Sequence, residues 1–227
     1  MATPIIYKWT ADTVDDVCLT QSVVVATTNK LVLNGNLSAG APYSVISFGN
    51  VSRTVSITST ANLTAVNFTI TGTYNGLPQT ETHAGPNNTT LYSTKFFNTI
   101  TSVTASANAA NVQIGTGTTG QTNWFCHDSY VQAPSLAVSV VKTAGTFTYS
   151  FEPTTSDAIN NYVQTASTLG IVIPNPDNAN AYTRIMNAAT ASINGWYQYP
   201  ARYSRISVTA SAGAVFQAFF MQQGVTN

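Results

Sequence analysis

Charge is what this sequence has least of. Its 227 residues include eight that are Lys or Arg and eight that are Asp or Glu, so charged residues make up 7% and the formal net charge is zero. An ordinary soluble domain carries about 25% charged residues. A nucleic-acid-binding surface needs clustered Lys and Arg to displace counterions from phosphates, and the eight cations are scattered. We therefore expect no nucleic-acid partner.

Long apolar runs and metal-binding patterns are also missing. No hydrophobic stretch approaches the length of a membrane span, and the first residues lack the basic and apolar segments of a signal peptide, so we expect no membrane association. The chain has two cysteines, Cys18 and Cys126, and two histidines, His83 and His127. Because close pairs of the C-x2-C or H-x3-H type are absent, we expect no metal and no other cofactor.

Alternation of apolar and polar residues is the dominant pattern that is present. Residues 53–58, 66–74 and 146–151 alternate with a period of two and are rich in β-branched and aromatic residues. This pattern indicates strands with one buried face and one solvent-exposed face. Glycine dipeptides stand where hairpin turns need a positive φ: Asn34-Gly35, Asn75-Gly76 and Ala144-Gly145.

One stretch departs from the period of two. In residues 182–193, Tyr182, Ile185, Met186, Ala189 and Ile193 recur near one face of a helix, although an irregular loop fits equally well. Residues 171–181 read as a loop from their Pro and Asn content. The expected fold class is all-β, with two tandem antiparallel β-sandwich or jelly-roll-like modules and at most one short helix.

A repeated hexamer, SVTASA, supports two modules. It occurs at residues 102–107 and 207–212, each time before a turn and a second strand-like segment. Each copy is predicted to belong to the closing hairpin of one module. The Gly- and Thr-rich residues 115–123 read as a linker, which places an N-terminal module at residues 1–120 and a C-terminal module at residues 121–227.

Several strand motifs resemble modules of tailed-bacteriophage structural proteins. The resemblance covers most of the chain but contains no catalytic signature. In the first half it rests on Arg53–Ser59, Phe68–Thr73, Glu81–Pro86 and Phe96–Val103. In the second half it rests on Leu136–Val141, Gly145, Phe147–Phe151, Thr154–Asp157, Trp196 and Gln222–Gly224.

This resemblance implies a virion component that is made in the cytoplasm of the bacterial host. The expected function is that of a non-enzymatic structural protein, which decorates or cements the capsid or forms part of the head–tail joint or tail. Its expected partners are further copies of itself and other virion proteins, such as the major capsid or tail proteins. The alternative is a receptor- or glycan-binding module of a tail appendage, and an enzyme comes third.

An aromatic cluster is the candidate contact surface. Trp196, Tyr197 and Tyr199 lie close together in residues 196–203. Aromatic side chains anchor protein interfaces and also stack on sugars, so we rank a protein–protein contact first, carbohydrate binding second and core packing third.

Two further groups of residues resemble sites but fit them poorly. Cys126, His127, Asp128 and Ser129 are adjacent in sequence, and on a strand neighbouring side chains point to opposite faces, whereas a catalytic triad needs side chains that converge. Asp12, Asp15 and Asp16 match no calcium loop and read as solvated turn residues. Both cysteines are expected to be free, buried thiols, since phage proteins mature in a reducing cytoplasm.

Overall fold

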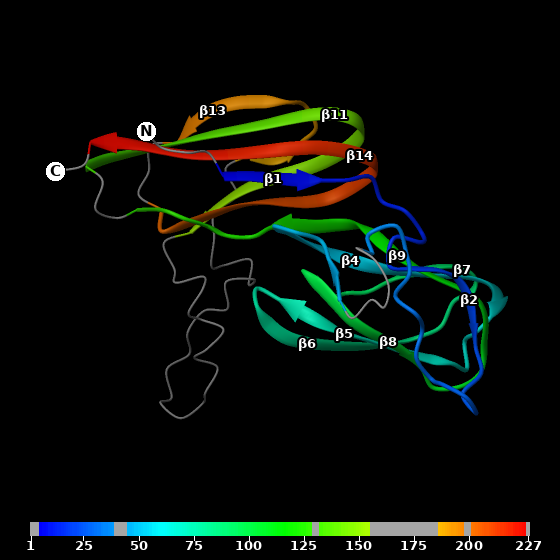
Figure 1. Ribbon diagram of the computed structural model, residues 1–227. Helices are drawn as coiled ribbons and strands as arrows, with labels where there is room; N and C mark the ends of the chain where they lie inside the picture. The colour runs from blue at the N-terminus through cyan, green and yellow to red at the C-terminus, as the bar shows by residue number, and fades with distance from the viewer. Residues whose placement is uncertain (1–4, 39–44, 129–131, 155–185, 198–200, 226–227) are drawn as a thin grey trace. The chain divides into compact units, whose positions relative to one another are not determined.

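The computed structural model of this chain is built from β-strands (Figure 1). It describes five stretches of the sequence: residues 5–38, 45–128, 132–154, 186–197 and 201–225. Every regular element in these stretches is a strand, and the strands form antiparallel sheets. The predicted all-β class is therefore confirmed, whereas the tandem arrangement of modules stays a prediction.

The chain divides into two compact units. The central unit is Ala11–Gly120, and the terminal unit joins Met1–Thr10 to Gln121–Asn227. Strand β1 (Ile5–Trp9) belongs to the terminal unit because it pairs with β14 (Tyr203–Val225), with Trp9 opposite Phe216. The sequence-based ranges had assigned this segment to the first module, since nothing in its local pattern names a partner more than 200 residues away.

The stretch predicted as a linker is instead part of a strand. β9 runs over Ala109–Thr122, and most of its residues from Gly115 onward are buried. Its glycines are there for close packing: a Cβ on Gly115 would lie 1.9 Å from the Thr13 carbonyl oxygen, and one on Gly117 would lie 2.0 Å from Thr54 Oγ1. The Gly and Thr residues of this stretch therefore allow a close approach of neighbouring backbone segments. They do not form the flexible linker that the composition predicts.

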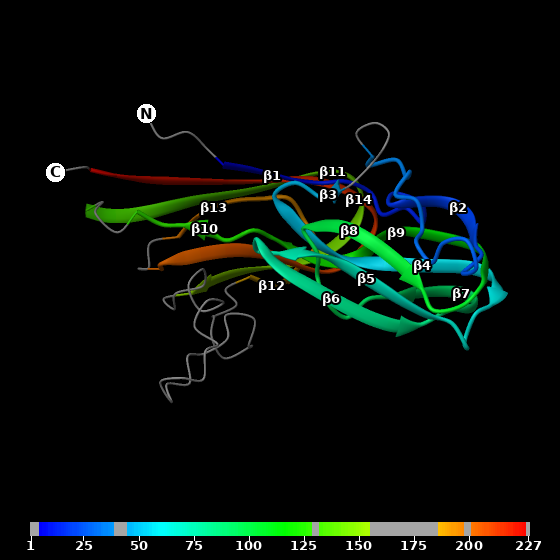
Figure 2. The same ribbon diagram turned by 60° about the horizontal axis from the view of Figure 1, so that its bottom comes forward.

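The central unit contains two layers of strands (Figure 2). In one layer, β4 pairs with β7, and β9 pairs with β2; β4 and β9 are neighbours in the sheet. In the other layer the order is β3-β8-β5-β6. Besides β9, the strands are β2 (Cys18–Val23), β3 (Ile46–Ser47), β4 (Val51–Asn62), β5 (Asn67–Tyr74), β6 (Leu77–Ala84), β7 (Asn87–Tyr92) and β8 (Thr99–Ala105).

Strand alternation correctly located β4 and β5, and in β5 it also gave the buried face. Phe68 and Ile70 of β5 are fully buried, and Asn75 and Gly76 adopt positive φ in the predicted hairpin turn to β6. In β4, however, the predicted exposed face is also buried, because Thr54 and its polar neighbours pack inside the unit. The Thr54 hydroxyl lies 3.1 Å from Thr119 Oγ1, so this buried hydroxyl is satisfied within the unit.

The terminal unit is organised around one long two-stranded ribbon. β11 (Gln132–Thr154) pairs antiparallel with β14 from Gln132 opposite Val225 to Thr154 opposite Tyr203. Shorter strands flank the ribbon: β1 and β10 (Phe125–Cys126) pair with β14, and β12 (Met186–Ala189) and β13 (Ile193–Tyr197) pair with β11.

The ribbon folds back on itself at a glycine corner (Figure 1). Register shifts interrupt the pairing between Lys142 and Thr146, and Gly145 and Gly213 both adopt positive φ, at 67° and 56°. A Cβ on Gly145 would lie 2.3 Å from the Gly213 carbonyl oxygen. The sequence predicted hairpin turns at these glycines, but both strands continue through the corner, so the glycines bend a ribbon and do not end it.

Aromatic rings from three strands stack against one another inside the bent ribbon. Trp9 stacks on Phe216 at 5.6 Å between ring centroids, Phe216 on Phe147 at 4.6 Å, and Phe147 on Tyr149 at 4.9 Å. These residues come from β1, β14 and β11, so three strands share one stack. Stacked aromatic pairs add about 0.5–1.5 kcal/mol each beyond the burial of their area.

The helix considered for residues 182–193 is not present where the structure describes them. Residues 182–185 and the predicted loop 171–181 lie outside the described residues. Met186–Ala189 form β12, with Met186 opposite Phe151 and Ala189 opposite Tyr149. Ala188 adopts a positive φ of 57°, which no right-handed helix accommodates. Pairing with β11 therefore overrides the local helical spacing.

The corner yields a matched pair of substitutions. Gly213→Ala meets no neighbouring atom and should lower the free energy of unfolding by about 1–2 kcal/mol, the usual cost of positive φ. Gly145→Ala carries the same cost and must also displace the backbone of Gly213, so we expect at least about 1 kcal/mol more. Urea unfolding of both variants measures the difference, and equal losses would contradict the close approach.

Candidate functional site

The predicted aromatic contact falls on an edge strand. Trp196 and Tyr197 lie on β13, where their backbones pair with Ala137 and Leu136 of β11. Tyr199 lies outside the described residues. Two of the three candidate residues therefore share a strand that, among the described strands, pairs on one side only.

The sequence-adjacent Cys-His-Asp-Ser group does not converge in its described part. Cys126 ends β10 and is exposed, and its sulfur lies 3.7 Å from the His127 carbonyl oxygen. The Asp128 backbone N–H donates a hydrogen bond to Gln222 Oε1, so Asp128 is held in place by its main chain. Ser129 lies outside the described residues. This is the geometry expected from alternation along an extended chain.

His127 instead packs against the core of the terminal unit. Its ring lies 5.2 Å from the Phe125 ring, edge to face, and its Nε2 is 2.8 Å from Ser204 Oγ. Ser204 is fully buried, so its hydroxyl is not accessible to a substrate. Burial lowers the pKa of the His127 imidazole to about 4. The ring is therefore neutral at physiological pH and stabilises the fold as a neutral group.

The two cysteines differ in exposure. Cys18 is fully buried, and burial raises the pKa of its thiol to about 12. Cys126 is exposed, which corrects the prediction that both thiols are buried. Both are free, as predicted.

A buried arginine organises one end of the central unit. Arg53 of β4 is almost fully buried, and its Nη2 donates to the Gly117 carbonyl oxygen at 2.7 Å. Burial lowers the pKa of Arg53 to about 10, although the charges of Asp12 and Asp16 oppose that shift. Asp16 itself is buried and accepts from Thr116 Oγ1 at 2.8 Å. The prediction of solvated turn residues is therefore wrong for Asp16.

A second polar cluster, which the sequence analysis does not predict as a site, surrounds Glu81 of β6. The Glu81 carboxylate accepts hydrogen bonds from the backbone N–H groups of Thr94 and Lys95, both at 2.9 Å, and lies 2.6 Å from His83 Nε2. Burial raises the pKa of Glu81, but these hydrogen bonds, including one from the Thr94 hydroxyl, outweigh it and hold the pKa below its usual value. The carboxylate holds the loop before β8 in place, and both of its oxygens accept hydrogen bonds from that loop.

The terminal unit contains a buried ion pair. Arg205 Nε donates to Glu152 Oε2 at 2.8 Å, and both side chains are almost fully buried. The Arg205 guanidinium also lies 4.3 Å from the centroid of the Trp124 ring. The two residues face each other across β11 and β14, where Glu152 pairs with Arg205. Removing one partner from such a pair would leave an uncompensated buried charge.

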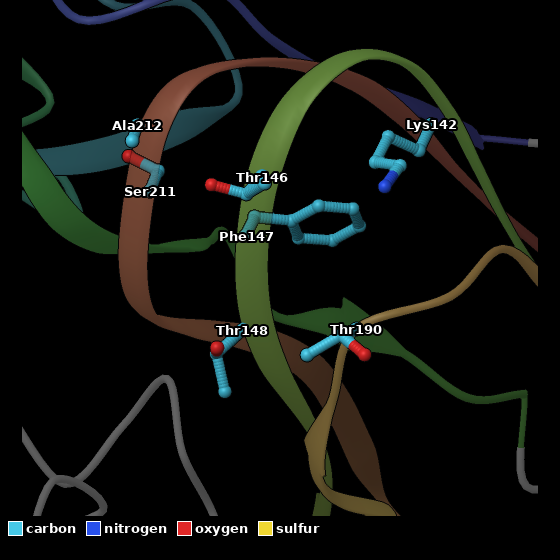
Figure 3. Close-up of a pocket in the computed structure, with 7 residues that line it drawn as sticks. All are labelled: Lys142, Thr146, Phe147, Thr148, Thr190, Ser211 and Ala212. Atoms are coloured by element: carbon cyan, nitrogen blue, oxygen red, sulfur yellow. The ribbon is translucent and has the colours of Figure 1, made fainter.

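The corner of the bent ribbon forms an open pocket of about 390 Å³ (Figure 3). Figure 3 shows the Lys142 ammonium group and the Phe147 ring inside the arch of β11, with Thr190 beside them. Among the described residues, the pocket is lined by Lys142, Thr146, Phe147, Thr148, Thr190, Ser211 and Ala212. None of these residues was singled out as a site from the sequence, because they come together only at the corner.

Comparisons with known proteins add no assignment: no protein-family model matches this chain, and no curated protein matches it. In the part of the chain that the structure describes, no cluster of three or more His, Cys, Asp and Glu side chains has the arrangement of a metal site. No helix among the described residues has the length and hydropathy of a membrane span.

Thiol labelling tests the two cysteine environments. In the native protein we expect one thiol, Cys126, to react quickly with a water-soluble disulfide reagent, and the second to react only after unfolding. The variant Cys126→Ser should show no fast phase. Two fast-reacting thiols in the native wild type would contradict the burial of Cys18.

The pH dependence of stability tests the His127 environment. Its pKa lies near 4 in the folded protein and near 6.5 in a model peptide. Protons therefore bind preferentially to the unfolded chain, and the stabilisation present above pH 6.5 is lost as the pH falls toward 4. One such group contributes at most about 1.4 kcal/mol per pH unit, and less here because the ring is partly exposed.

Urea unfolding between these pH values provides the measurement. We expect a smaller loss of stability on acidification for His127→Gln than for the wild type, since titrating carboxylates are common to both proteins. Parallel pH profiles of the two proteins would contradict this expectation, because they would show that folding does not change the pKa of His127.

Proposed function

We propose that this chain is a non-enzymatic structural protein of a tailed-bacteriophage virion. It decorates or cements the capsid, or forms part of the head–tail joint or tail, and it assembles with copies of itself and with other virion proteins. The proposal rests on the strand motifs that resemble phage modules and, in the structure, on uncharged strands at the edges of its sheets.

The edge strand β7 carries this argument in the central unit. Among the described strands it pairs with β4 alone, and Thr89–Tyr92 lie in regular register with Ser56–Ser59. Its six residues include no charge and no proline, and Tyr92 is 47% exposed. Soluble monomers usually protect an open edge with charge, proline or a covering segment, because unpaired backbone groups recruit other strands. An edge without such protection suits a subunit whose neighbours cover it.

Strand β13 presents a similar edge in the terminal unit. Its sequence, Ile193–Tyr197, is also free of charge and proline, and it pairs with β11 alone among the described strands. Trp196 and Tyr197 lie on this strand, so we retain them, with Tyr199, as the candidate protein–protein contact. Aromatic residues supply much of the binding energy at protein interfaces.

The use of the buried charges supports a structural role. Arg53, Glu81 and the Glu152–Arg205 pair each hold segments of the fold together through hydrogen bonds within their own unit. The chain has only sixteen Lys, Arg, Asp and Glu residues, and these four are engaged inside the fold, so ion pairs have a small supply of side chains at the surface. Assembly through apolar and backbone contacts is consistent with this distribution.

Sedimentation of the purified protein, alone and with phage particles that lack it, tests the proposal. We expect a homo-oligomer or a particle-bound state that persists between about 0.1 M and about 1 M salt, where the Debye length shrinks from about 10 Å to about 3 Å. Thr89→Lys adds a charge to the β7 edge and should weaken association if that edge is covered. Ala65→Lys, in an exposed turn, is the matched control.

Trp196→Ala provides the corresponding test at β13. A protein that stays monomeric and binds no particle would overturn the assembly proposal, as would binding that disappears in high salt. Equal association of the wild type, Thr89→Lys and Trp196→Ala would leave assembly standing and exclude these two edges as its contacts.

A further inference from the structure

The corner pocket in the terminal unit has rigid walls. Residues 190–192 connect β12 to β13; Thr190 lines one wall of the pocket, and the connection is tied to β11 at two points. The Tyr149 hydroxyl donates to the Ala191 carbonyl oxygen at 2.8 Å, and the Lys142 backbone N–H donates to Ser192 Oγ at 3.0 Å. Both bonds join the connection to β11, one on each side of the corner. The pocket is therefore formed before any ligand arrives, which limits the entropy cost of binding.

Its volume suits a small ligand. About 390 Å³ lies at the lower end of the range for small-molecule sites, roughly 300–1,000 Å³. Such a space accommodates one or two sugar rings. A larger polymer could occupy it only with a terminal residue.

The polar lining carries one positive charge and several hydroxyl groups. Lys142 is the only charged residue in the described part of the lining, and its ammonium group lies inside the arch of β11 (Figure 3). The remaining polar residues are Thr146, Thr148, Thr190 and Ser211. Hydroxyl side chains both donate and accept hydrogen bonds, as the hydroxyls of a sugar do, and an ammonium group pairs with an anionic substituent.

The lining residues argue against a nucleobase and against a purely apolar ligand. Phe147 is 3% exposed, and its ring already stacks on Phe216 and Tyr149. It therefore has no free face for a nucleobase, which single-strand binding proteins stack on open aromatic rings. A purely apolar ligand would offer no hydrogen-bond partner to the Lys142 ammonium group.

We propose that the corner pocket is a binding site for a small acidic saccharide, with Lys142 pairing with the carboxylate and Thr190 hydrogen-bonding to ring hydroxyls. This role is independent of the virion assignment, since it depends on the pocket alone. The sugar could be free or the end of a surface glycan, and the chemistry recognised is the same.

Calorimetric titration of the full chain tests the site with defined probes. We expect saturable binding of glucuronic acid and of N-acetylneuraminic acid, and at least about 10-fold weaker binding of glucose, which lacks the charge. Inorganic phosphate should bind no more tightly than glucose, because it lacks the ring hydroxyls. An immobilised glycan that ends in the preferred acid then distinguishes a free sugar from a glycan terminus.

Two variants locate the binding. Lys142→Gln should weaken binding of the acids by about 10- to 100-fold, which is the range for losing one charged hydrogen bond, and should leave the weak binding of glucose unchanged. Lys8→Gln removes an exposed charge from β1 of the same unit and should change nothing. Thr190→Val removes the hydroxyl at nearly constant volume and should weaken binding of the acids and of glucose alike.

Nuclear magnetic resonance of the wild type supplies a readout independent of variant stability. Titration with the preferred acid should shift the amide signals of residues 142–148, 190–192 and 211–212. Shifts elsewhere, equal losses in Lys142→Gln and Lys8→Gln, or no saturable binding of either acid would overturn the proposal. Phosphate that binds as tightly as the acids would reduce the pocket to a general anion site and overturn its saccharide specificity.

Discussion

The close approach of Gly145 and Gly213 is the constraint on which the terminal unit depends. Two paired strands, β11 and β14, can fold back together only if their backbones nearly touch at the corner, and a side chain on Gly145 would occupy the position of the Gly213 carbonyl group. Positive φ at both residues provides the bend. The aromatic stack, the wall at residues 190–192 and the pocket inside the arch all follow from that bend.

The aromatic stack shows how the bend in the ribbon creates a hydrophobic core in the terminal unit. Phe147 lies just after the bend in β11 and Phe216 just after the bend in β14, yet their rings stack at 4.6 Å. A straight ribbon would separate these two positions along its length. The fold-back also brings β12 and β13 to the same strand on either side of the corner, and so creates the connection that closes the pocket.

In a chain so poor in charge, the few buried ionic groups have structural tasks. Arg53 and Glu81 each satisfy backbone groups of segments distant in sequence, and both belong to the strand motifs that resemble phage modules. Gly85, in the same motif as Glu81 (Glu81–Pro86), leaves no room for a side chain, since a Cβ would lie 2.6 Å from the Leu63 carbonyl oxygen. These motif positions are therefore explained by the fold itself. The described surface carries few charges besides its hydroxyls, amides and apolar side chains, which is the basis of the proposed assembly.

The sequence by itself determined the elements whose pattern is local. Alternation located β4 and β5, and the Asn75-Gly76 turn was correct because positive φ at those residues needs no distant partner. Tertiary structure alone decided the rest. Only the packing of Thr13 and Thr54 against β9 shows that Gly115 and Gly117 belong to a strand, and only pairing with β14 places β1 in the terminal unit. A glycine in sequence permits a flexible linker, a hairpin turn, a corner or a close contact, and the choice among them is made by the atoms that other segments bring against it.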